Sequence, residues 1–261
     1  MRILQVPGLG AVLVLAMSMT GCSGGDDATA RPTTSTVTVT ASATPAHSSV
    51  AVTSSKARTP NATSRARLVS ALDAAIERAG QPVGVAIVPV GRSARAITAG
   101  DQTPMVAWST IKVPVAVASE RANGQSASQT PAIVESDNAA AEHLWSSLGS
   151  DPDAAAAVTE VLRDGGDTTT TVPSAHLRSG FTIFGQTTWP LRDAAAFTAH
   201  LPCMAGTEHV LSLMGQVAGN QQWGVEAMAS PVSTAVKGGW GPGPASGDVV
   251  RQIGLITLVG L

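Results

Sequence analysis

The fold of this chain is decided by one stretch, residues 108–118, which reads WSTIKVPVAVA. Its apolar residues predict a helix after a loop, and Pro114 falls in the first turns, where a missing backbone N–H costs least. Ser109 and Lys112 are three positions apart and so share one face of the helix. The positive end of the helix dipole favours negative charge on the serine, and a buried lysine can accept its proton.

A lone S-x-x-K also arises by chance in a serine-rich sequence, so it needs support from other motifs. Two further motifs follow along the chain. The first is Ser136-Asp137-Asn138, whose hydroxyl can pass a proton to a leaving group and whose amide can orient a substrate amide. The second is Lys237-Gly238-Gly239, at the end of an expected strand. A strand edge can pair with an extended substrate, and the lysine can hold a carboxylate.

Together, the three motifs resemble the S-x-x-K, S-D-N and K-T-G set of serine β-lactamases and penicillin-binding proteins. The flanks agree, since an expected strand containing VGVAI and a turn precede the S-x-x-K helix, as in class A β-lactamases. The resemblance spans roughly residues 65–261. A looser likeness, at residues 184–189 (FGQTTW), is to alanine-rich actinobacterial lipoproteins of the LppW kind, which are β-lactamase-like.

The resemblance implies a role for each motif residue. Ser109 would be the acylated nucleophile, with Lys112 as its base. Ser136 would pass a proton to the leaving nitrogen. Asn138 would hold the substrate amide, and Lys237 would attract a substrate carboxylate.

It also implies that the strand with the third motif forms one side of the binding site, where Gly239 and Trp240 would meet the substrate. The backbone N–H groups of Ser109 and Trp240 would form the oxyanion hole. Such donors contribute about 2.7–4 kcal/mol each to catalysis.

The sequence departs from the family pattern within the motifs. Gly238 follows Lys237 in place of threonine or serine, so a hydroxyl that would bind the substrate carboxylate is absent. Trp240 is bulky and is expected to narrow the cleft. Only 27 positions separate Ser109 from Ser136, which predicts an abridged helical subdomain.

Two other departures concern the loop and the end of the chain. Class A β-lactamases use a loop glutamate for deacylation, whereas the only acid between Asp167 and Glu208 is Asp193, expected in the first turn of a helix. An acyl-enzyme should then persist, which favours a penicillin-binding pattern over rapid turnover of β-lactams. The family continues with another strand and a C-terminal helix, so an end at Leu261 predicts a fragment or a reduced architecture.

Periodicity predicts the elements around the motifs. Helices are expected at residues 65–79, 108–118, 138–148, 152–164 (with Asp151 as N-cap), 190–201 and 208–218. Strands are expected at 83–90, 95–99, 232–237 and 249–259, with a Gly-rich loop at 238–243. This order indicates an α+β fold whose sheet is assembled from both ends of the chain. The resemblance implies a β-lactamase/DD-peptidase-like antiparallel sheet flanked by helices.

The N-terminal sequence predicts a signal peptide and a lipid anchor. Arg2 and an apolar run too short to span a bilayer are typical of a signal peptide, residues 1–21. The run ends in MTGC at residues 19–22, which resembles a bacterial lipobox and implies that Cys22 is lipidated on the extracytoplasmic face of the cell membrane. The alternative is an ordinary signal with a chance cysteine. Residues 22–64 are rich in Ser, Thr, Ala and Pro and predict a tether before the domain at 65–261.

Composition excludes several classes of protein. The 261 residues carry 16 Lys+Arg and 18 Asp+Glu, and only 13% are charged. A nucleic-acid partner is not expected, because that would need a dense basic face. The absence of tyrosine excludes a tyrosine base. The five histidines have no convincing metal spacing, the two cysteines lie far apart, and no metal or cofactor is implied. Cys203 is expected to be a small core residue.

Two functions remain open at this stage. The first is a serine hydrolase or acyl-transferase that acts outside the membrane on a β-lactam or an amide in peptidoglycan. The second is a catalytically inactive lipoprotein that keeps the fold to bind cell-wall peptide or an envelope protein. The three motifs favour the first function, and the departures from the family pattern favour the second.

Overall fold

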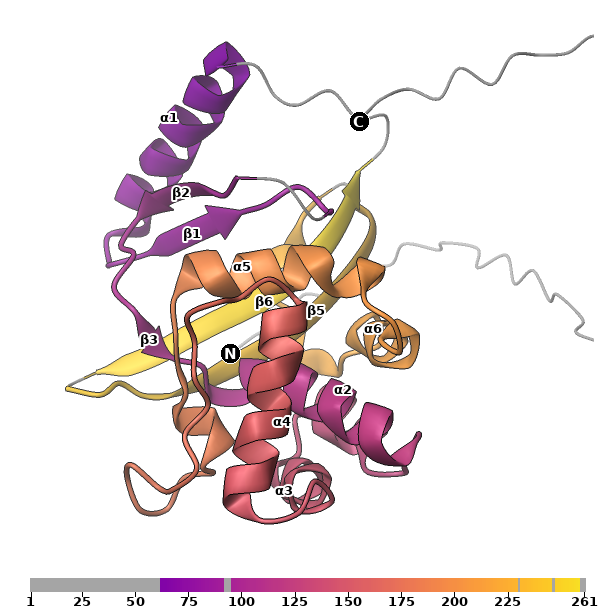
Figure 1. Ribbon diagram of the computed structural model, residues 1–261. Helices are drawn as coiled ribbons and strands as arrows, with labels where there is room; N and C mark the ends of the chain where they lie inside the picture. Colours follow the sequence, from indigo (N-terminus) through magenta and orange to yellow (C-terminus); the bar gives the residue numbers. More distant parts are fainter. Residues whose placement is uncertain (1–61, 92–94, 230, 246, 259–261) are drawn as a thin grey trace, which may run out of the picture. The chain divides into compact units, whose positions relative to one another are not determined.

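The computed structural model describes residues 62–91, 95–229, 231–245 and 247–258 (Figure 1). The predicted signal peptide, Cys22 and nearly all of the tether lie outside the described residues. Helix α1 (Ala62–Ala79) begins shortly before the predicted start of the domain. In the described part of the chain, no helix has both the length and the apolar character that a membrane crossing requires.

The order of elements is that of an α+β fold. After α1 the helices are α2 (Lys112–Asn123), α3 (Asn138–Ser146), α4 (Asp151–Asp164), α5 (Leu191–His200) and α6 (Glu208–Met214). The strands are β1 (Gly84–Ile87), β2 (Ile97–Gly100), β3 (Met105–Val106), β4 (Thr188–Trp189), β5 (Pro231–Pro242) and β6 (Asp248–Leu258). Short turns of helix are η1 (Trp108–Ile111), η2 (Pro131–Glu135), η3 (Phe184–Gln186), η4 (Leu201–Cys203), η5 (Gly219–Gln221) and η6 (Gly224–Ala227).

The strands pair as three antiparallel sheets of two strands, β1–β2, β3–β4 and β5–β6. Among the described residues no ladder joins β1 or β2 to β5 or β6, so the prediction of one sheet assembled from both ends of the chain is wrong. Helix α5 contacts both β1 and β6 and so links the two hairpins by packing. A backbone hydrogen bond from Gly91 N to Ala199 O (3.1 Å) adds to this link.

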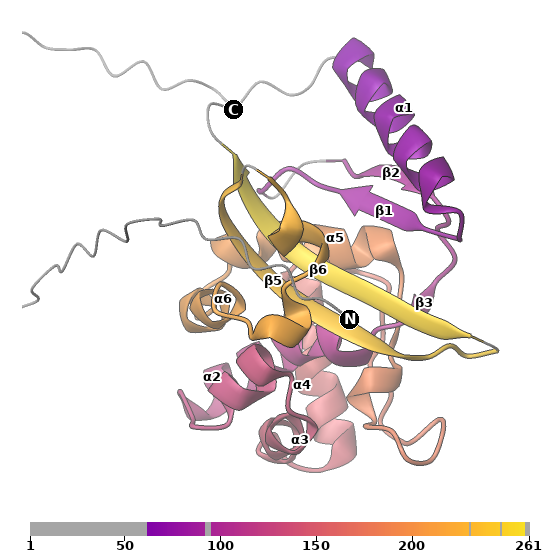
Figure 2. The ribbon, with the colours of Figure 1, turned by 180° about the vertical axis from the view of Figure 1, so that it is seen from behind.

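The β5–β6 hairpin is longer than the sequence predicted. The ladder continues from Lys237 opposite Ile253 to Pro242 opposite Asp248, so residues 238–242 are strand and the predicted Gly-rich loop is wrong there. Glycine is needed at position 239, because a Cβ atom would lie 2.9 Å from the backbone N of Ser109. Seen from behind, this hairpin lies in front of α5 (Figure 2).

Helix α2 lies at the centre of the helical part of the molecule. Residues 112–119 are all buried, and a helix that is apolar on every side belongs in a core. It contacts α3, α4 and α6. The predicted helix over 108–118 is therefore confirmed from Lys112 onward, whereas Ser109 lies in the 3-10 turn η1 that precedes it.

Three local predictions are wrong. The N-cap of α4 is Ser150 and not Asp151, because Ser150 and Asp153 form a reciprocal capping box. Helix α6 ends at Met214, four residues before its predicted end. Cys203 is exposed in η4 and is no core residue.

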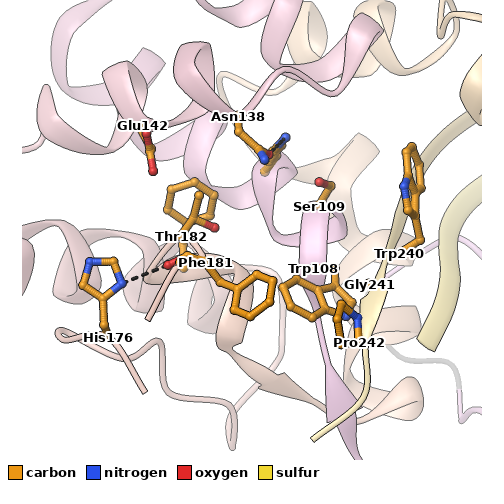
Figure 3. Close-up of a pocket in the computed structure, with 13 residues that line it drawn as sticks. Trp108, Ser109, Asn138, Glu142, His176, Phe181, Thr182, Trp240, Gly241 and Pro242 are labelled. Carbon is orange, nitrogen blue, oxygen red and sulfur yellow. Dashed lines mark hydrogen bonds between the residues drawn. The ribbon is translucent and has the colours of Figure 1, made fainter. Parts of the chain in front are cut away.

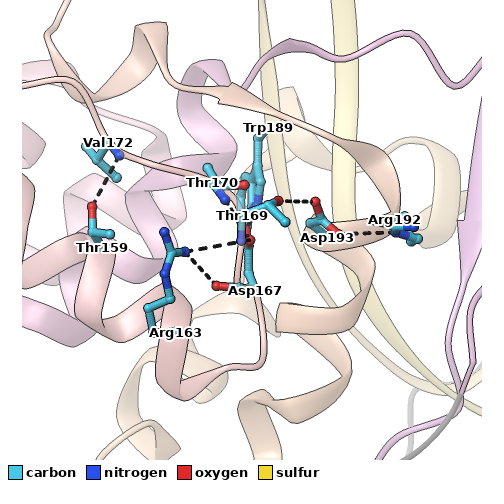
Figure 4. A network of polar contacts seen from close by, with 9 residues as sticks. All are labelled: Thr159, Arg163, Asp167, Thr169, Thr170, Val172, Trp189, Arg192 and Asp193. Carbon is cyan, nitrogen blue, oxygen red and sulfur yellow. Dashed lines mark hydrogen bonds and ion pairs between the residues drawn. The ribbon is translucent and has the colours of Figure 1, made fainter.

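Buried polar contacts fix the segment between α4 and α5 (Figure 4). The Asp167 carboxylate accepts hydrogen bonds from Trp189 Nε1 (2.8 Å) and from the backbone N of Thr169 and Thr170. Thr169 Oγ1 donates to the carboxylate of Asp193 (2.6 Å), in the first turn of α5. Asp193 lies in the first turn of a helix, as the sequence predicted, and holds this segment to α5.

Candidate active site

Ser109 lies in η1, directly before the N-terminus of α2, and is half-buried. The residue before it, Trp108, has a φ of 47°, a conformation that costs free energy for any residue with a Cβ atom. The Trp108 ring packs edge-on against Phe181 at 5.0 Å, with the Arg178 guanidinium 5.2 Å from the ring centre. These contacts hold the strained turn that presents Ser109.

Ser136 is the second strained residue. Trp108 and Ser136 (φ 60°) are the two non-glycine residues of the described chain with positive φ. Strain of this kind is kept where the surroundings over-determine the backbone, often at functional sites. One strained residue therefore directly precedes Ser109, and the other is Ser136 itself.

Lys112 is held by the whole S-D-N segment. Its Nζ donates to the backbone O of Ser136 (2.6 Å), to the backbone O of Asp137 (3.1 Å) and to Asn138 Oδ1 (2.8 Å). Burial lowers the pKa of Lys112 to about 8, and the charges of Asp137 and Glu142 oppose that shift. Ser109 Oγ has no hydrogen-bond partner among the described residues, so the amine and the hydroxyl are neighbours without a direct bond.

Lys237 lies in the middle of β5 and not at a strand end, and it is fully buried. Its Nζ donates to Ser136 Oγ (2.9 Å), to Gly238 O (2.9 Å) and to Gln221 Oε1. Burial and the charge of Lys112 hold the pKa of Lys237 well below its usual range. Ser136 therefore connects the two lysines, through its backbone oxygen to one and its hydroxyl to the other.

Gln221 is a site residue that sequence analysis missed. It is fully buried, and its Nε2 donates to the backbone O of Ile133 (2.9 Å) and Val134 (2.7 Å). Its Oε1 accepts from Lys237 Nζ and from the backbone N of Gly238 (3.0 Å). All four hydrogen-bonding positions of the amide are thus used to hold η2 against β5. No motif marks a lone glutamine in a loop, so the sequence carries no signal for it.

A cavity of about 450 Å³ opens at these residues (Figure 3). Ser109, Lys112, Asn138 and Trp240 line it, as the sequence predicted for a site. Ser136, Lys237 and Gly239 lie behind the lining and support it. Strand β5 runs against η1 at Gly239, which brings the backbone of Trp240 and that of Ser109 to one end of the cavity.

The side of the cavity formed by residues 176–184 contains no acid. It consists of His176, Phe181, Thr182 and nearby residues, and the His176 ring is hydrogen-bonded to Phe181 O (2.9 Å). The acidic residue among those that line the cavity is Glu142, one helical turn after Asn138 on α3. Sequence analysis missed Glu142, although the spacing of four from Asn138 indicates that both face one side of the helix.

The missing hydroxyl at Gly238 has a packing reason. A Cβ atom at Gly238 would lie 3.1 Å from the Trp223 ring and 3.3 Å from the Trp240 ring. The two indoles occupy the space that a threonine side chain would need. The absence of a side chain at Gly238 is therefore coupled to the presence of indoles at Trp223 and Trp240.

The fold and this arrangement define a class: the chain has the β-lactamase-like α+β fold that the resemblance implied. It is similar to a β-lactamase from Xanthomonas campestris (TM-score 0.52, 20% identity, 76% of this chain and 85% of that chain). It is also similar to an ancestral class A β-lactamase (0.51, 20%, 74% and 86%) and to a β-lactamase from Burkholderia vietnamiensis (0.50, 19%, 74% and 83%). At these identities the likeness shows the fold alone. No protein-family model matches the chain, and no curated protein matches it in sequence.

Proposed function

We propose that this chain is an acyl-serine enzyme of the β-lactamase and penicillin-binding kind, which acts on a β-lactam or on an amide of cell-wall peptide. The observation that carries the proposal is the position of Ser136. Its backbone oxygen accepts from Lys112 and its hydroxyl accepts from Lys237, beside the cavity that contains Ser109. Three motifs far apart in the chain thus meet beside one cavity.

The proposed acylation moves two protons. The neutral amine of Lys112 takes the proton of Ser109 Oγ, which attacks the carbonyl carbon while the backbone N–H groups of Ser109 and Trp240 stabilise the oxyanion. The C–N bond then breaks, and Ser136 passes its proton to the leaving nitrogen while it takes up the proton that Lys112 received from Ser109, so Lys112 is neutral again. Asn138 holds the substrate amide, and the positive charge near Lys237 attracts a carboxylate.

Slow deacylation follows from the side of the cavity at residues 176–184. Hydrolysis of the ester needs a base that activates water, and that side contains His176, Phe181 and Thr182 but no acid. We therefore propose a long-lived acyl-enzyme, closer to a penicillin-binding protein than to a rapid β-lactamase.

A fluorescent penicillin tests the proposal. We expect one adduct per chain, with the mass of the intact penicillin and located at Ser109 by peptide mass spectrometry. Ser109→Ala should abolish the adduct and Lys112→Ala should slow its formation at least a hundredfold, within the range of general-base effects. An unlabelled wild-type chain would overturn the proposal.

The second candidate is a catalytically inactive lipoprotein that binds cell-wall peptide or an envelope protein. The observation that favours it is that the Lys237 amine is fully buried and that Trp223 and Trp240 occupy the space beside Gly238. It predicts a thermal shift with cell-wall peptide, equal for wild type and Ser109→Ala, and no adduct with penicillin.

Localisation is part of the same proposal. We propose that Cys22 is acylated and holds the domain at the extracytoplasmic face of the cell membrane, as in lipoproteins of the LppW kind. Cys22→Ser should move the protein from the membrane fraction to the soluble fraction. Membrane partition that is unchanged in that variant would contradict the anchor.

A further inference from the structure

A second hollow lies on the other face of the β5–β6 hairpin. Side chains alternate along a strand, so Lys237 and Gly239 face Ser136 and η1, behind the lining of the first cavity, while Gly238 and Trp240 face the opposite side of the hairpin. In the register of the hairpin, Trp240 is opposite Val250, and Pro242 is opposite Asp248. This face carries a groove of about 420 Å³ lined by Asn220, Trp223, Trp240, Gly241, Asp248 and Val250.

The groove is held by the hairpin itself. Gln252 Nε2 donates to the backbone O of Trp223 (2.9 Å) and of Gln221 (3.2 Å), and Gln252 Oε1 accepts from Val225 N (2.9 Å). Trp223 Nε1 donates to Asn220 O (3.2 Å). Both indoles pack over Gly238, so their positions are coupled. Trp240 nevertheless remains 44% exposed.

The charged residue that lines the groove is acidic. Asp248 contributes a carboxylate to the lining, and no lysine or arginine is among the lining residues. Two cationic side chains of the hairpin point elsewhere: Lys237 binds Ser136 and Gln221, and Arg251 donates to backbone oxygens of β3 and β4. Indole faces are the negative side of the ring and attract cations. Two indoles and one carboxylate therefore complement a positively charged organic group.

We propose that this groove binds an organic ammonium group, primary or quaternary. A neutral apolar group or a sugar ring would stack on the indoles but would leave Asp248 unused. The groove and the catalytic cavity share Trp240 and Gly241. A substrate bound covalently to Ser109 would therefore reach the groove with a cationic substituent. This last statement rests on the proposed function. The binding of a cation in the groove does not depend on it.

Choline and its neutral isostere 3,3-dimethylbutan-1-ol test the inference, because they have the same shape and differ in charge. Binding is measured by tryptophan fluorescence and by NMR on the full chain carrying Ser109→Ala, so acylation plays no part. We expect choline to bind about 5- to 30-fold more tightly than the neutral isostere. Equal binding of the two probes, or binding of neither, would overturn the proposal.

Two variants locate the site. Asp248→Asn should weaken choline binding several-fold and leave binding of the neutral isostere unchanged, whereas Asp73→Asn, an identical charge change on the exposed face of α1, should change neither. Trp223→Leu should weaken the binding of both probes. Far-UV circular dichroism checks that this variant is folded. If Asp248→Asn behaves like Asp73→Asn, the cation site is not in this groove.

Discussion

Ser136 contacts both buried lysines of the site, which its place in a three-residue motif does not indicate. Its left-handed backbone turns the carbonyl toward Lys112, while its hydroxyl meets Lys237 on a strand that is 101 positions away. Neither lysine has a carboxylate among its hydrogen-bond partners. Each amine is therefore held by neutral oxygens, and its protonation is set by burial and by the charges of its surroundings.

At this scale the rate of acylation should depend on the charge of Lys112. A pKa of about 8 means that most Lys112 is protonated at neutral pH, so the rate of penicillin labelling should rise as pH passes through about 8. Glu142 raises the pKa of Lys112. Glu142→Gln should therefore shift the profile to lower pH. The measurement is the second-order labelling rate between pH 6 and 10, and an unshifted profile would contradict the role of Glu142.

Gln221 should be essential although no motif marks it. Gln221→Leu removes the side-chain partner of Ile133 O and of the backbone N of Gly238, at about 1–3 kcal/mol for each buried group, whereas Val134 O keeps its bond from Ala218 N (3.0 Å). We expect a loss of about 2–4 kcal/mol in the free energy of unfolding by urea. The control is Gln216→Leu, which removes an exposed amide and should stay within about 0.5 kcal/mol.

A second variant at the same position separates function from packing. Gln221→Glu keeps the acceptor for Lys237 and adds a charge, which should raise the pKa of Lys237. If the Lys237 charge attracts a substrate carboxylate, penicillin labelling of this variant should persist to higher pH than in the wild type. If Gln221 has a purely structural role, the variant should change the free energy of unfolding and leave the pH profile of penicillin labelling unchanged.

At the scale of elements, β5 is where the sequence was least informative. Glycine weakens strand propensity, so GGWGPG at residues 238–243 predicted a loop. The structure needs these glycines for close approach: Gly239 lies against the backbone of η1, and Gly241 lies against the Trp108 ring. Those contacts are long-range, and local propensity cannot report them. The helices were predicted well, because their apolar periodicity is local.

Neighbouring glycines of β5 should respond differently to one methyl group. At Gly239 a Cβ atom would lie 2.9 Å from the backbone N of Ser109 and of Thr110, which cannot give way without moving η1. Gly239→Ala should lose about 1–3 kcal/mol of stability and most penicillin labelling. At Gly238 the contacts are the ends of two indoles, so Gly238→Ala should keep both the stability and the penicillin labelling of the wild type. Thermal denaturation and labelling of the pair check this, and equal losses would contradict it.

At the scale of the molecule, the S-x-x-K and S-D-N motifs lie in contact, as Lys112 donates to all three residues of the S-D-N segment. Lys237 was assigned a direct contact with substrate, whereas it lies fully buried behind the cavity lining. Its burial depends on Gln221 and on strand pairing with β6, neither of which a single sequence displays. The separation of the hairpins has the same cause, since α5 packs on β1 and β6 through contacts distant in sequence.

Buried lysines without carboxylate partners should make the whole domain more stable in mild alkali. In the unfolded chain Lys112 titrates near its ordinary pKa of 10.5, and in the folded chain it titrates at about 8. Between these values the unfolded chain binds more protons, so the free energy of unfolding rises with pH, by up to about 3 kcal/mol for Lys112. Lys237, whose pKa is lowered by burial and by the charge of Lys112, adds to the rise. Urea unfolding at pH 7, 8 and 9.5 should show this increase, and Lys112→Met should flatten it. Stability that does not rise over this range would contradict the lowered pKa values of the two amines.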